Sequence, residues 1–158
     1  MYDIDLIFYK MDTFLFILIV FITFCLMEIV AWASHKYIMH GFLWVLHKDH
    51  HKKDHDSWFE RNDLFFLQFA GISAIFVVLW GEYDVWFGLP VAIGIFLYGL
   101  AYFIVHDIFI HRRFKLFRNI NHWYARGIRR GHKIHHKHLG KEDGECFGML
   151  WVPKKYFK

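Results

Sequence analysis

The sequence has few of the residues that hold thiolate metal sites or small secreted domains together. It contains only two cysteines, Cys25 and Cys146, and two prolines among 158 residues. No C-x2-C pair is present, so neither a zinc finger nor a cysteine-bound iron–sulfur site is expected, and we expect no disulfide. A nucleophile elbow, a phosphate-binding loop and a dinucleotide fingerprint are also missing. These absences exclude the common hydrolase, nucleotide-dependent and thiolate chemistries.

The sequence contains long apolar runs of the kind found in membrane proteins. Hydrophobic residues make up 56% of the chain and aromatic residues 22%, including 19 phenylalanines, which is typical of a membrane protein. Three runs, residues 13–34, 64–80 and 85–105, are long enough, or nearly so, to cross about 30 Å of hydrocarbon as helices. We therefore expect an all-α integral membrane protein, a single domain over residues 1–158 with three to four transmembrane helices. The first run is expected to be a retained anchor, because it is too long for a signal peptide.

The basic residues predict which side of the membrane the loops face. Lys10 alone precedes the first run, and the other eighteen of the nineteen Lys and Arg residues fall in segments that share one side. The positive-inside rule makes that side cytoplasmic and leaves the polar lead, residues 1–12, on the periplasmic side. The same topology brings two histidine-bearing segments, residues 35–56 and 106–138, together as a cytoplasmic helical cap.

Ten of the thirteen histidines recur in two copies of one pattern, H-x4-H followed by H-x2-H-H. On a helix the second motif puts three imidazoles on one face. Members of the first motif are separated by about 140° on an α-helix, which suits one ligand to each of two neighbouring ions. Ten imidazoles exceed the four to six ligands that one ion needs, so the pattern predicts a two-metal centre. The candidate ligands are His35, His40, His47, His50, His51, His106, His111, His132, His135 and His136.

Four further features have two interpretations each. Glu28, inside the first run, either supports the metals or contacts another helix. Asp107 either orients an imidazole by accepting its second N–H or is a surface acid. The histidines outside the pattern, His55 among them, are outer hydrogen-bond partners or solvated. The basic, aromatic stretch 112–130 can meet anionic lipid or dock an acidic electron-donor protein, and the two roles are compatible. Nucleic-acid binding is not expected, because this charge lies beside membrane helices.

The histidine series resembles that of the fatty acid hydroxylase superfamily, whose members are membrane di-iron enzymes. The flanking sequence more narrowly resembles the bacterial β-carotene 3-hydroxylase family. The matching words are M-E-I-V-A-W-A-S-H-K-Y-I-M-H-G from Met27, N-D-L from Asn62, Y-F-I-V-H-D from Tyr102, H-K-I-H-H from His132 and F-G-M-L-W-V-P from Phe147. This resemblance runs from the first apolar run almost to the C-terminus.

The resemblance implies hydroxylation of the β-ionone rings of β-carotene at C3, giving zeaxanthin via β-cryptoxanthin. It implies two irons held by the ten histidines, O2 as cosubstrate, and electrons from NAD(P)H through ferredoxin and its reductase. Zinc can replace iron in a purified sample. The implied setting is the bacterial inner membrane, with a carotenoid dissolved in the bilayer. The sequence leaves the substrate-binding residues and homo-oligomer formation open.

Related chemistry and another class of protein stay open as alternatives. The first is a carotenoid 4-ketolase or a fatty acid or sterol hydroxylase with the same metal centre. The second is a membrane metal transporter or sensor, which should place polar ligands along its membrane helices. The three apolar runs offer only Glu28 for that purpose.

Overall fold

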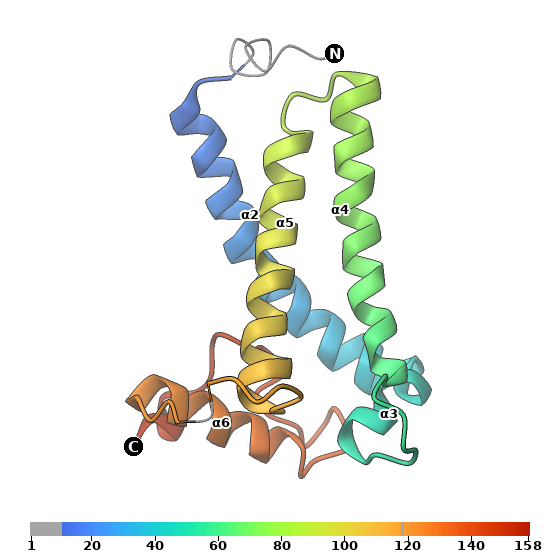
Figure 1. Ribbon diagram of the computed structural model, residues 1–158, viewed down its shortest axis with the longest axis vertical. Coiled ribbons are helices and arrows are strands. Elements are labelled where there is room, and N and C mark those ends of the chain that lie inside the picture. Colours follow the sequence, from blue (N-terminus) through green and yellow to red (C-terminus); the bar gives the residue numbers. More distant parts are fainter. Residues whose placement is uncertain (1–10, 118) are drawn as a thin grey trace. The chain divides into compact units, whose positions relative to one another are not determined.

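A computed structural model describes residues 11–117 and 119–158, and every regular element among them is a helix (Figure 1). The elements are α2 (Thr13–Ala33), η1 (Ser34–Phe42), α3 (Trp44–His51), η2 (Arg61–Asp63), α4 (Leu64–Tyr83), α5 (Gly88–Tyr102), η3 (Phe103–Ile110), α6 (Trp123–His135) and η4 (Lys154–Phe157). The all-α prediction is therefore confirmed for the described ranges. Most of the predicted polar lead, residues 1–12, lies outside them.

Three helical stretches are long and apolar enough to span a membrane. They are Thr13–Phe42, Arg61–Tyr83 and Gly88–Ile110, and they overlap the three predicted runs. All three are longer than predicted, and the first and third extend into histidine-bearing segments, with non-helical backbone at Gly41 near the end of the first. A fourth stretch of this kind does not occur in residues 11–117 or 119–158. Residues 11–117 and 119–158 thus contain three helices long and apolar enough to span a membrane, as the hydropathy predicts.

The chain divides into two compact units. One consists of Met1–Met27 with Phe66–Gly99, and the other of Glu28–Phe65 with Leu100–Lys158. The first unit holds the larger part of α2, α4 and α5. All ten patterned histidines belong to the second unit.

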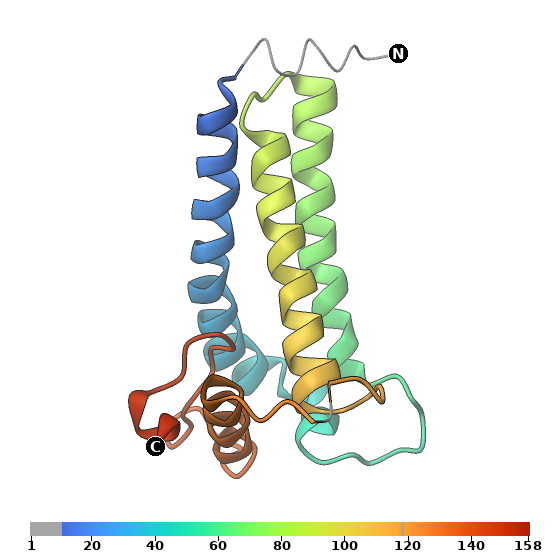
Figure 2. The same ribbon diagram turned by 60° about the vertical axis from the view of Figure 1, so that its left-hand side comes forward.

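Within the first unit, α5 packs between α2 and α4 (Figures 1 and 2). A Cβ on Gly94 would lie 2.6 Å from Thr23 Cβ and 2.8 Å from the Val20 carbonyl oxygen. The glycine therefore allows a close approach of α2 and α5, as small residues do in membrane helix pairs. On the other side of α5, the Ser73 hydroxyl of α4 donates a hydrogen bond of 3.0 Å to the Ala92 carbonyl.

Replacing Gly94 with alanine is expected to destabilise this unit by about 1–3 kcal/mol, because the added methyl group overfills the helix contact. Thermal unfolding in detergent measures the loss. Gly71→Ala is the matched control, since a Cβ there meets nothing within 4 Å. Equal unfolding midpoints for the two variants would contradict this packing.

The second unit contains two π-helical segments, and each carries one H-x4-H pair. His35 and His40 lie on η1, and His106 and His111 lie on or directly after η3. A π-helix closes its hydrogen bonds between residues five apart, so such residues fall on nearly the same face. The ring centroids are 5.1 Å apart in the first pair and 4.6 Å apart in the second. π-Helical winding therefore turns both members of a pair toward one position.

Candidate metal centre

Nine of the ten patterned histidines form two groups in which one ring nitrogen per residue lies within 4.8 Å of the others. The first group is His35, His40, His47, His51 and His135. The second group is His50, His106, His111 and His132. Each group contains both members of one H-x4-H pair. The prediction that a pair serves two separate ions is wrong, because that prediction assumed α-helical rotation.

The two halves of the chain exchange one ligand. His47 and His51 of α3 belong to the first group, whereas His50 between them turns to the second. On α6, His132 belongs to the second group and His135 to the first. The duplicated sequence thus produces two sites that share the helices α3 and α6.

His136, the tenth patterned histidine, lies next to both groups. Its ring centroid is 4.4 Å from that of His51, 4.5 Å from that of His132 and 5.0 Å from that of His111. Its Nε2 is buried and has no hydrogen-bond partner. In the repeat, His136 occupies the place that His51 holds in the first half of the chain.

Six of the imidazoles are oriented by a hydrogen bond at Nδ1. Three donate to backbone carbonyls: His35 to Phe147 at 2.8 Å, His40 to Leu139 at 3.0 Å and His135 to Glu145 at 3.1 Å. Three meet side-chain oxygens: His47 with Asn62 at 2.6 Å, His50 with Glu60 at 3.0 Å and His106 with Asp107 at 3.3 Å. A donating Nδ1–H leaves the lone pair on Nε2. Metal-bound histidines show this same outer hydrogen bonding.

The inward-facing nitrogens have the spacing that ligands take around an ion. In the first group, Nε2 of His47 lies 3.0 Å from that of His35 and 3.1 Å from that of His51. In the second, the His111 and His132 Nε2 atoms are 2.7 Å apart. Metal–imidazole bonds of about 2.0–2.1 Å place ligands at right angles about 3 Å apart. The rings present therefore fit a metal ion in each group.

Unsatisfied nitrogens support the same conclusion for the second group. The Nε2 atoms of His50 and His106 are buried without a hydrogen-bond partner, as is that of His136. Buried polar atoms are nearly always paired in folded proteins. A bound cation would satisfy all three lone pairs at once.

Burial keeps these rings in the neutral form that binds metals. Desolvation lowers the pKa of His47 from 6.5 to about 3 and that of His136 to about 4. The pKa values of His50 and His132 also fall well below 6.5, through burial first and then through neighbouring histidines. Neutral imidazole is the metal-binding form, so binding at neutral pH does not require these rings to lose a proton.

The residues predicted to support the metal ligands from outside differ in what they contact. Asp107 accepts from His106, the residue just before it, and not from His111. Glu28 Oε1 accepts hydrogen bonds from backbone N–H groups of the C-terminal segment. His55 lies outside both groups, bonded to Asp49 Oδ2 at 3.1 Å. The other two unpatterned histidines, His122 and His138, are exposed.

Two functional partners were not found from the sequence. Glu60 and Asn62 orient His50 and His47, but neither is spaced from its histidine in a way that marks a helical contact. Glu60 and Asp63 form a capping box directly before α4. Only the N-D-L word around Asn62 drew attention to this turn.

Arg113 connects the acids of this outer layer. Its Nη1 donates to Asp63 Oδ1 and Asp107 Oδ1, each at 2.8 Å, and its Nη2 to Asp63 Oδ2 at 2.9 Å. Asp63 in turn accepts from the Glu60 backbone N–H at 3.1 Å. One guanidinium thus holds Asp107, which orients His106, and through Asp63 it also holds the backbone of Glu60, which orients His50. The paired acids raise the pKa of Arg113, so it stays charged.

Arg113→Gln is expected to weaken metal retention by about 10–100-fold, the usual cost of losing an outer partner. Metal content after dialysis against graded chelator measures this change. Arg112→Gln removes the same charge from the exposed neighbouring side chain and is expected to behave as wild type. Equal chelator resistance in the two variants would contradict the role of Arg113.

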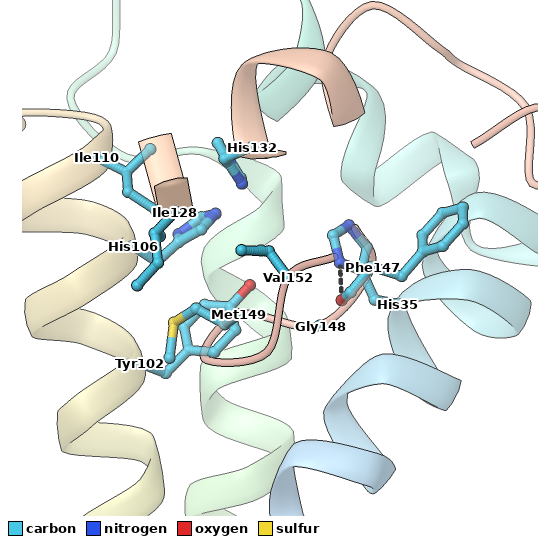
Figure 3. A pocket seen from close by; sticks show the side chains of 10 residues that line it. All are labelled: His35, Tyr102, His106, Ile110, Ile128, His132, Phe147, Gly148, Met149 and Val152. Carbon is cyan, nitrogen blue, oxygen red and sulfur yellow. Dashed lines mark hydrogen bonds between the residues drawn. The ribbon is translucent and has the colours of Figure 1, made fainter. Parts of the chain in front are cut away.

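A cavity opens beside the histidines of both groups (Figure 3). Its volume is about 10 Å³, roughly the space that one water molecule occupies. The remaining wall is largely apolar and includes side chains from η3, α6 and the C-terminal segment. The lining residues are His35, Tyr102, His106, Ile110, Ile128, His132, Phe147, Gly148, Met149 and Val152.

Comparison with known proteins agrees with this geometry. The profile of the family described as "Fatty acid hydroxylase" matches residues 20–153. The chain belongs to the fatty acid hydroxylase family. It is a hydroxylating oxygenase with helices long and apolar enough to span a membrane and a histidine cluster suited to metal.

Several relatives of this hydroxylase carry more specific names. It is 40% identical over 137 residues to "Beta-carotene hydroxylase" of Pantoea ananas, covering 86% of this chain and 77% of the relative. It is 41% identical over 141 residues to a Paracoccus protein of the same name, covering 86% and 83%. "Beta-carotene 3-hydroxylase 1, chloroplastic" of Arabidopsis thaliana is 33% identical over 135 residues, covering 82% of this chain and 42% of that protein. No solved structure matches the chain.

Proposed function

We propose that this hydroxylase inserts oxygen at C3 of each β-ionone ring of β-carotene, giving zeaxanthin via β-cryptoxanthin. The observation that carries the proposal is the pair of buried histidine groups beside an apolar cavity. The 40% identity to the Pantoea ananas protein named beta-carotene hydroxylase supports the substrate. Two irons would supply the O2 activation that no side chain provides.

We assign one iron to each histidine group and place His136 with the second. Its unpaired Nε2 supports this placement, and its ring lies within 5.0 Å of three members of the second group, His132, His50 and His111, but of only His51 in the first. The protein's own contribution is to hold neutral rings with their Nε2 atoms inward and to fix them through Nδ1. Zinc would bind the same nitrogens in a sample purified without added iron.

The surroundings of the site suit a substrate dissolved in lipid. Apolar side chains such as Ile128, Met149 and Val152 line the cavity and exclude water from the reacting carbon.

Electrons are proposed to come from NAD(P)H through ferredoxin and its reductase. The exposed basic residues Arg126 and Arg130 of α6 offer charge complementary to such an acidic donor. The positive-inside rule supports a cytoplasmic site in a bacterial inner membrane.

Expression in a bacterium that accumulates β-carotene tests the proposal. Chromatography and mass spectrometry are expected to show zeaxanthin with some β-cryptoxanthin. A 4-keto product would instead identify a ketolase built on the same centre. Unchanged β-carotene, with the protein present in the membrane and an electron donor supplied, would overturn the carotenoid assignment.

A further inference from the structure

Glu28 binds three consecutive backbone groups with one carboxylate oxygen. Its Oε1 accepts hydrogen bonds from the N–H groups of Met149, Leu150 and Trp151, each at 2.9 Å. Bonds to an ionised acceptor are stronger than those between neutral groups. An ionisable residue within a membrane-spanning stretch is costly, so such a residue is normally engaged for a purpose. Here the carboxylate anchors the C-terminal segment to the helix that carries His35.

The neighbouring residue shows how closely the segment wraps this carboxylate. A Cβ on Gly148 would lie 2.7 Å from Glu28 Oε1 and 3.4 Å from the Trp151 carbonyl oxygen. A side chain at position 148 would therefore have to displace the Glu28 carboxylate from the position in which it accepts the three N–H groups. Residues 148–151 therefore form a turn around Glu28 Oε1, which fixes the position of their backbone.

The same segment forms one wall of the cavity. Gly148, Met149 and Val152 line it together with His35, His106 and His132 (Figure 3). Met149 and Val152 are only 5% and 4% exposed. The wall held by Glu28 thus shares this cavity with histidines of both groups.

We propose that Glu28 is a positioning residue that determines which ring carbon is hydroxylated. A β-ionone ring is far larger than the cavity volume of about 10 Å³, so side chains such as Met149 must move aside when substrate enters. The backbone held by Glu28 stays in place and limits how far and in which orientation the ring can advance. Without the carboxylate, the backbone of residues 148–151 can move away from the cavity, and the ring can bind in more than one orientation. This inference rests on the proposed function and assigns its regiochemistry to a residue that belongs to neither histidine group.

Three variants test the inference in cells that accumulate β-carotene. Glu28→Ala removes the acceptor oxygen. Gly148→Ala adds a methyl group that pushes Glu28 Oε1 away from the three N–H groups. Both are expected to lower the yield of 3-hydroxylated product per bound metal about tenfold or more, because a misplaced ring reacts poorly at C3, and to add products oxidised at other ring carbons. Glu28→Gln keeps an oxygen that can accept the three N–H groups, so it is expected to retain 3-hydroxylation. Gly81→Ala is the control, because a Cβ there meets nothing within 4 Å.

Hydrogen exchange and metal content supply readouts that do not depend on turnover. The amides of residues 149–151 are expected to exchange faster in Glu28→Ala than in wild type, with metal content unchanged. Wild-type products together with protected amides in Glu28→Ala would overturn the inference. Metal loss as complete as that of a ligand variant would also overturn it, since Glu28 would then build the metal centre. If wild type hydroxylates no carotenoid, the proposed function fails by itself, and the exchange rates still decide whether Glu28 holds the wall.

Discussion

Replacement of His50 by alanine is expected to abolish product formation and to empty one of the two metal positions. His50 is 7% exposed, and it joins the second group although its neighbours on α3 belong to the first. Its Nε2 has no protein partner, while Glu60 fixes its Nδ1. Loss of an outer partner alone costs about 10–100-fold, so loss of a ligand should lower activity by at least about 100-fold. Pigment analysis and elemental analysis of the purified protein measure the two effects.

Two further variants show whether the effect of His50→Ala is specific to a metal ligand. His138→Ala removes an exposed histidine outside both groups and is expected to leave pigments and metal content as in wild type. His135→Ala is expected to have an effect like that of His50→Ala, but on the first group, since the two residues exchange places between the halves of the chain. Retention of both ions and of activity in His50→Ala would show that the exchange of ligands between α3 and α6 does not occur.

Removal of metal is expected to destabilise the second unit strongly. Ligand that binds only the folded state stabilises it by about 4 kcal/mol when present at 1,000 times its dissociation constant. If each histidine group binds one ion as proposed, each ion should contribute on this scale, because its ligands come from distant parts of this unit. Chelator treatment in detergent is therefore expected to lower the unfolding midpoint by many degrees. Limited proteolysis should then cut first within residues 28–65 or 100–158.

A matched control separates metal loss from other effects of the chelator. His50→Ala, which is expected to hold one ion, should lose less of its remaining stability than wild type on treatment. Restoring iron or zinc should restore the wild-type midpoint. An unfolding midpoint that chelation leaves unchanged would contradict a structural role for bound metal in this unit.

The three long helices and the presence of two metal positions could be predicted from the sequence, because both depend on patterns of neighbouring residues. Hydropathy over 13–34, 64–80 and 85–105 located the three long helices, since membrane-spanning helices need such runs. The duplicated histidine motif indicated two positions for metal, and two groups are present. The partition within the H-x4-H pairs was wrong. It depends on π-helical winding, which the spacing of His35 and His40 alone does not reveal.

The outer partners of the histidines could not be predicted, because they come from distant parts of the chain. The carbonyl of Phe147 meets His35, which is 112 residues earlier, and that of Leu139 meets His40. Backbone carbonyls carry no sequence signature, since every residue has one. Glu28 could be predicted in part. Its charge within an apolar run indicated that it has a role, but only the fold shows that it binds backbone N–H groups more than 100 residues away.

The metal content of the wild-type chain, purified from iron-supplemented cells, tests the two-metal centre most directly. Elemental analysis should give two ions per chain, counted as iron plus any zinc, because the histidines form two groups and each fits one ion. A single ion per chain, or none, in protein that still forms zeaxanthin would contradict a two-metal hydroxylase.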